Sequence, residues 1–80
     1  MLTNDLWEKV RRDLVLYKKD IDIDFDGGYI IITPYERVIV SIGNKIYRYS
    51  LDEFIDAVDK NDDIACFAVN YIDAYYYSFE

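Results

Sequence analysis

The chain has 80 residues, of which 52% are hydrophobic and 18% aromatic, and this composition indicates one compact domain rather than intrinsic disorder. Sixteen acidic residues against nine basic ones give a net charge of −7, which disfavours direct binding to nucleic acid or to anionic lipid. Cys66 is the only cysteine, so no internal disulfide can form, and no segment resembles a signal peptide or a membrane span. We therefore expect a cytoplasmic protein.

The first predicted element is a helix over residues 4–17. Thr3 or Asn4 can cap this helix, and Asp5 lies in its first turn. Apolar residues then recur with a spacing near 3.6 residues, which predicts one buried face: Leu6, Val10, Leu14 and Tyr17.

Residues 20–26 alternate aspartate with a large apolar residue, which is typical of a strand with one buried face and one exposed face. The period of two directs Ile21, Ile23 and Phe25 to the core. It directs four aspartates to the other side: Asp20, Asp22, Asp24 and Asp26. Alternate residues of a strand are about 6.6 Å apart, which is close to two axial steps along one DNA strand. The sequence therefore predicts a row of carboxylates that imitates phosphates and binds a basic protein surface.

Two glycines follow the aspartate strand and predict a hairpin. The pair Gly27-Gly28 is expected to form the turn, with Asp26 opposite Tyr29. The second strand of the hairpin is predicted over residues 29–33.

A second hairpin is predicted over residues 38–49, after the break at Pro34. Gly43-Asn44 is expected to form its turn, with Ile42 opposite Lys45. On this register one face carries Val38, Val40, Tyr47 and Tyr49, and we expect that face to meet the helices. The other face is left open as an alternative, because Ile31, Ile39 and Ile46 make it partly apolar.

Ser50 and Glu53 have the spacing of a capping box and predict the start of a second helix. Its buried side is expected to contain Leu51, Phe54, Ile55 and Val58. Its exposed side is expected to add three carboxylates to the protein-binding surface: Asp52, Asp56 and Asp59.

The last predicted element covers residues 64–77, and the pattern is compatible with a helix or a strand. Alanines and Asn70 favour a helix, although propensity decides weakly over so short a segment. The apolar stripe of that helix would contain Ile64, Phe67, Ala68, Tyr71, Ile72 and Tyr75. Together the elements predict a single α+β domain over residues 1–80 in the order α-β-β-β-β-α-α. Its four-stranded antiparallel sheet would have the helices mainly on one face.

No catalytic site is predicted. The chain has no histidine, Cys66 has no basic neighbour, and no phosphate-binding glycine motif is present. We expect a non-enzymatic protein without a cofactor. The alternative is a calcium-binding module, because Asp22, Asp24, Asp26 and Gly27 reproduce the first half of an EF-hand loop. The position that requires a bidentate glutamate in such a loop is Thr33.

Aromatic residues gather at the C-terminal end: Tyr71, Tyr75, Tyr76, Tyr77 and Phe79. Tyrosine beside carboxylates is typical of protein-binding surfaces, so Tyr76 is included in the predicted site. A further alternative is a homodimer joined through Tyr75, Tyr76 and Tyr77, so the sequence leaves open whether the protein is a monomer or a dimer.

The predicted order of elements resembles that of small acidic anti-CRISPR proteins encoded by phages. The shared segments are Asn4-Asp5-Leu6 in the opening helix, the turn Gly43-Asn44, and Glu53-Phe54-Ile55 in the helix that follows the sheet. The resemblance implies an inhibitor that acts as a DNA mimic in the cytoplasm of the host cell. Such an inhibitor occupies the basic nucleic-acid-binding site of a CRISPR effector nuclease.

Overall fold

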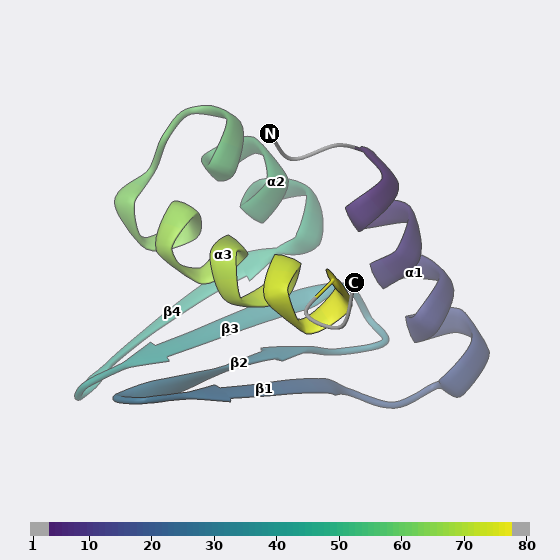
Figure 1. Ribbon diagram of the computed structural model, residues 1–80, viewed down its shortest axis with the longest axis horizontal. Helices are drawn as coiled ribbons and strands as arrows, with labels where there is room; N and C mark the ends of the chain where they lie inside the picture. The colour runs from purple at the N-terminus through teal and green to yellow at the C-terminus, as the bar shows by residue number, and fades with distance from the viewer. Residues whose placement is uncertain (1–3, 78–80) are drawn as a thin grey trace.

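The computed structural model describes residues 4–77, which form three helices and one four-stranded sheet (Figure 1). The elements follow in the order α1 (Asn4–Tyr17), β1 (Ile21–Phe25), β2 (Gly28–Ile32), β3 (Arg37–Ile42), β4 (Lys45–Ser50), α2 (Leu51–Asp59) and α3 (Asp63–Tyr77). The predicted fold class and element order are confirmed, and residues 64–77 are helical. Thr3 and Phe79, which entered the predictions above, lie outside the described residues.

Consecutive strands pair antiparallel in the order β1-β2-β3-β4, and the three helices lie on the same side of the sheet (Figure 1). The inner face of the sheet contributes alternate residues to the core: Ile21, Ile23, Ile30, Ile32, Val38 and Val40. The helices contribute the rest: Leu6, Trp7, Val10, Leu14, Leu51, Phe54, Ala65, Ala68, Val69 and Ile72. The prediction that Val38 and Val40 face the helices is confirmed, and no helix within residues 4–77 covers the outer face of the sheet.

The first hairpin differs from the predicted register by two residues. Phe25 pairs with Gly28, so the turn consists of Asp26 and Gly27 rather than of the two glycines. Gly27 has a φ of 103°, a conformation that favours glycine. Gly28 is instead part of β2, where a Cβ atom would overlap the backbone carbonyl of Ser41 on β3. Because the shift is even, every side chain keeps its predicted face.

The second hairpin has the predicted register. Ile42 pairs with Lys45 around the turn Gly43-Asn44, in which Gly43 has a φ of 59°. The break before this hairpin is a tight turn in which the backbone N–H of Glu36 donates to the carbonyl of Thr33 at 2.9 Å.

The buried face of α1 differs from the prediction at its end. Leu6, Val10 and Leu14 are buried as expected, but the side chain of Tyr17 is 64% exposed. Tyr17 lies in the last turn of the helix and does not pack against the core. Trp7 is buried instead and makes an edge contact with the ring of Phe54, with centroids 5.9 Å apart.

The buried face of α3 is rotated from the predicted stripe. Ala68 and Ile72 are buried as predicted, and Ala65 and Val69 are buried with them, whereas Phe67 and Tyr75 are 40% and 50% exposed. Small alanine side chains let this helix approach the neighbouring elements closely, and larger rings do not fit there. Tyr71, which was also predicted to be buried, lies at the side of the helix and stacks on Phe25 of β1 with centroids 4.6 Å apart.

Candidate protein-binding surfaces

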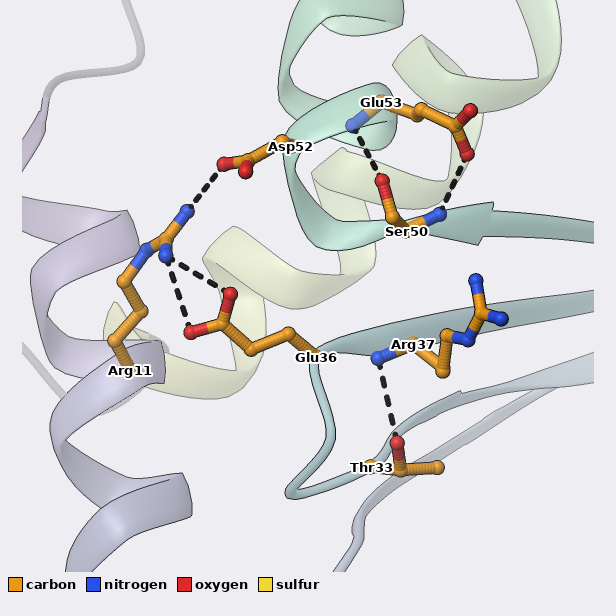
Figure 2. A network of polar contacts seen from close by, with 7 residues as sticks. All are labelled: Arg11, Thr33, Glu36, Arg37, Ser50, Asp52 and Glu53. Atoms are coloured by element: carbon orange, nitrogen blue, oxygen red, sulfur yellow. Dashed lines mark hydrogen bonds and ion pairs between the residues drawn. The ribbon is translucent and has the colours of Figure 1, made fainter.

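The capping box fixes the start of α2. The Ser50 hydroxyl accepts a hydrogen bond from the backbone N–H of Glu53 at 3.0 Å, and the Glu53 carboxylate accepts one from the backbone N–H of Ser50 at 2.9 Å (Figure 2). Leu51 and Phe54 are buried beneath the helix, so its other side faces solvent. That side displays the three predicted carboxylates, all exposed: Asp52, Asp56 and Asp59.

Two of these three carboxylates already have a cationic partner. Asp52 accepts a hydrogen bond from Nη2 of Arg11 at 2.8 Å (Figure 2). Asp56 lies 3.0 Å from Nζ of Lys60, four residues along the chain. Within residues 4–77, Asp59 has no such ion pair. The negative charge of α2 is therefore partly neutralised within the protein itself.

The four aspartates of residues 20–26 form the aspartate ladder, as the alternation predicted. Asp22 and Asp24 are exposed on the outer face of β1, Asp20 precedes the strand and Asp26 lies in the turn after it. No lysine or arginine of the described part of the chain lies within ion-pair distance of any of them. The ladder therefore presents unneutralised carboxylates at about 6.6 Å intervals along a hydrogen-bonded strand.

The ladder also has a structural role that requires no partner. β1 is at the edge of the sheet, and charged side chains on an edge strand disfavour pairing with the edge of another sheet.

The structure does not bring the two groups of carboxylates together. α2 packs against β4 and β3, on the helical side of the sheet, whereas the ladder lies on the outer face of β1. Three strand spacings, about 14 Å, separate β1 from β4. The predicted site residues therefore form two separate surfaces instead of one continuous acidic surface.

The last predicted site residue, Tyr76, is part of a contact between helices. It is half-buried, and its hydroxyl donates a hydrogen bond to Asp13 of α1 at 3.0 Å. Burial, together with that hydrogen bond, raises the pKa of Tyr76. Lys9 lies over the ring of Tyr77, with Nζ 4.3 Å from the ring centroid. Since only Tyr75 of the three tyrosines is exposed, the geometry does not favour a shared tyrosine interface.

The geometry also does not favour the calcium alternative. An EF-hand loop curves around its ion, whereas Asp22 and Asp24 lie on an extended strand and point the same way without converging. Among the described residues, no group of three or more acidic, histidine or cysteine side chains is placed to hold a metal ion.

The sequence analysis missed two arginines on the same outer face as the ladder. Arg37 on β3 and Arg48 on β4 line a cavity of about 260 Å³ together with Tyr49 and Glu53. Both arginines are exposed, and neither forms an ion pair within the described residues. The correct register of the second hairpin contained this information, because it places Arg48 opposite Ile39 on the outer face.

No helix within residues 4–77 is both long and apolar enough to cross a bilayer. Comparisons with protein-family models, with curated proteins and with solved structures find no match to this chain. The class that the structure defines is therefore a small α+β domain with a helical layer on one face of an antiparallel sheet and unneutralised carboxylates on the other.

Proposed function

We propose that this protein is a non-enzymatic, acidic binding protein whose aspartate ladder occupies a basic, nucleic-acid-binding site on another protein. The observation that carries the proposal is the ladder itself. Asp22 and Asp24 are exposed on one face of a strand, with Asp20 and Asp26 at its ends, and none of the four has a cationic partner in the described chain.

The strand supplies the geometry that imitation of phosphates requires. Backbone pairing of Asp22 with Ile31 and of Asp24 with Tyr29 holds both carboxylates at a fixed separation. A binding site for nucleic acid is basic, so it attracts such a row over a distance and raises the association rate. The attraction falls as salt is added, because ions screen charges that are exposed to solvent.

The particular partner proposed is a CRISPR effector nuclease, with the protein acting as a phage-encoded inhibitor in the cytoplasm of the host. The support for this partner is the resemblance in element order and in the segments that contain Asn4, Gly43 and Glu53. Asp59 on α2 is a secondary contact candidate, since it is exposed and not ion-paired within the described residues.

The test is a competition experiment with a guide-loaded CRISPR effector nuclease and its labelled target DNA. Added protein should prevent DNA binding, and the double substitution Asp22→Asn and Asp24→Asn should weaken this inhibition at least about 10-fold, because two charges are lost without a change in side-chain shape. The same experiment at higher salt should show weaker inhibition by the wild-type protein.

A matched control removes the same charge from a different surface. Glu8→Gln on α1 and Asp63→Asn on α3 are exposed positions on the helical side, outside both groups of predicted carboxylates, and should change inhibition by less than about threefold, which is the effect of net charge alone. If both double variants inhibit as well as the wild type does, the ladder is not the binding surface. If the wild type inhibits no effector, capture from bacterial lysates at low and high salt will show whether any other nucleic-acid-binding protein is retained through the ladder.

A further inference from the structure

The outer face of the sheet carries an ordered charge pattern in addition to the aspartate ladder. The strand register places four residues in one row across the sheet, in the order Asp22, Ile31, Ile39 and Arg48. The row therefore begins with an acid on β1, continues with two apolar side chains on the central strands, and ends with a base on β4.

The next row also begins with an acid but ends with an apolar side chain. It runs from Asp24 through Tyr29 and Ser41 to Ile46, which is 47% exposed. Arg37 on β3 adds exposed positive charge to the outer face. The outer face is thus acidic along β1, largely apolar in the middle and basic at Arg37 and Arg48.

We infer that this face is the interface of a symmetric homodimer whose twofold axis runs parallel to the strands. Such an axis places β1 of one copy over β4 of the other. Asp22 then faces Arg48 of the partner subunit, and Ile31 faces the partner subunit's Ile39. The twofold symmetry repeats each of these contacts, so each occurs twice in the dimer. A twofold axis across the strands would place the aspartate ladder of one copy over that of the other, and their like charges would repel.

A second copy fits the whole face better than a purely basic partner does. A basic surface complements Asp22 and Asp24 but repels Arg37 and Arg48, which are unpaired within the described residues. The same face of a second copy places an acid, Asp22, opposite Arg48 and covers the central isoleucines, Ile31 and Ile39, which are only half-buried.

The size of the face predicts a weak dimer. Four strands of about five residues cover a footprint of roughly 300 Å² per copy. Stable complexes usually bury about 800 Å² on each partner. We therefore expect a weak, reversible association, and a monomer at low concentration.

The dimer also implies regulation of the proposed binding site, a point that depends on the proposed function. The interface covers Asp22 and Asp24, so a second copy and a basic partner protein compete for the same face. Inhibition of the partner should then increase more slowly than the protein concentration once dimers form.

The test is sedimentation velocity over protein concentrations from about 5 to about 500 µM. The average mass should rise from the monomer value of 9.5 kDa towards twice that value. Asp22→Arg alone, or Arg48→Asp alone, should weaken dimerisation at least about 10-fold, because each places like charges opposite one another. The double variant Asp22→Arg with Arg48→Asp restores opposite charges and should recover dimerisation to within about threefold of the wild type.

Control variants carry the same charge changes on other surfaces. Asp59→Arg on α2 and Arg12→Asp on α1 are exposed positions away from the outer face and should leave dimerisation unchanged. Circular dichroism verifies that each variant is folded. Absence of dimers at the highest concentration, or failure of the double variant to recover, would overturn the inference.

The two proposals can fail separately. If the protein stays monomeric but substitution of the ladder abolishes binding to the nuclease, the dimer is wrong and the proposed function stands. If the charge exchange restores the dimer while the ladder variants inhibit the nuclease normally, the dimer stands and the proposed function is wrong.

Discussion

Arg11 on α1 donates two hydrogen bonds to the carboxylate of Glu36, at 3.0 and 3.1 Å, and thereby ties the first helix to the loop between β2 and β3 (Figure 2). Its second terminal nitrogen reaches Asp52 at the start of α2. The backbone carbonyl of Glu36 also accepts a hydrogen bond from the N–H of Leu51 at 2.7 Å. One guanidinium group therefore connects three segments that are distant in the sequence.

Loss of this connection should destabilise the fold moderately. Arg11→Met should lower the free energy of unfolding by about 1 kcal/mol, because the guanidinium and the Glu36 carboxylate are partly exposed and water weakens their attraction. Urea denaturation at low and high salt measures the change, which should shrink as salt is added. Arg12→Met is the matched control, since Arg12 has no ion pair within the described residues, and an equal loss in both variants would contradict this role.

The capping box at Ser50 should contribute a separate increment of stability. Ser50→Ala removes the acceptor for the backbone N–H of Glu53 and should lower the free energy of unfolding by about 1 kcal/mol. For a domain of this size the melting temperature should fall by about 4–8 °C. Glu53→Gln retains an oxygen that can accept from the Ser50 N–H and should stay within about 0.5 kcal/mol of the wild type. Thermal unfolding followed by circular dichroism compares the two variants, and a larger loss for Glu53→Gln would argue against the capping box.

Gly28 in β2 should tolerate substitution less well than Gly43 in the turn of the second hairpin. Gly28→Ala directs a Cβ atom into the backbone carbonyl of Ser41, so β2 and β3 must separate locally, at a cost of about 3 kcal/mol. Gly43→Asn places a side chain in open space, at a φ of 59° that asparagine adopts readily, and should cost less than about 1 kcal/mol. Urea denaturation of both variants gives the comparison. Equal stability would show that the β2–β3 register differs from the one described.

Two tyrosines should make the fold sensitive to alkaline pH. Burial, followed by the nearby charge and hydrogen bond of Asp62, raises the pKa of Tyr49 to about 12, against an ordinary value of 10.0. The unfolded chain therefore loses this proton at lower pH than the folded protein does. The resulting stability is complete below pH 10 and is lost as the pH rises towards 12. The raised pKa of Tyr76 acts in the same direction.

The measurement is the free energy of unfolding at several pH values between about 9 and 12. The double variant Tyr49→Phe and Tyr76→Phe should show a smaller fall over this interval than the wild type. Tyr35→Phe is the control, because the side chain of Tyr35 is 89% exposed and makes no hydrogen bond within the described residues. A wild-type stability that rises with pH in this interval would contradict the prediction.

Features that depend on a few neighbouring residues were predicted correctly from the sequence. Ser50 and Glu53 form the capping box, and Gly43 forms the second hairpin turn, because each depends only on local backbone bonds and dihedral angles. The faces of β1 were also predicted correctly, because alternation between Ile23 and Asp24 can satisfy a buried and an exposed side in only one way.

Features that depend on distant contacts were predicted less well. Gly28 belongs to β2 rather than to the turn because the carbonyl of Ser41, thirteen positions away, leaves no room for a side chain. Tyr17 has helical spacing but lies where the core does not extend. In α3, smaller residues are buried in place of the predicted Phe67 and Tyr75, because the space between the helices and the sheet decides which face of a helix is buried.

For the candidate site, the sequence by itself determined that the aspartates of residues 20–26 are displayed together, because a strand has only two faces. Only the tertiary structure decided that Asp52 is neutralised by Arg11, and that Asp22 shares a row with Arg48 from the far edge of the sheet. The physical reason is the separation in sequence between the residues that interact. Alternation and capping act within a few residues, whereas ion pairs and rows across a sheet depend on strand register and on the packing of segments more than twenty positions apart.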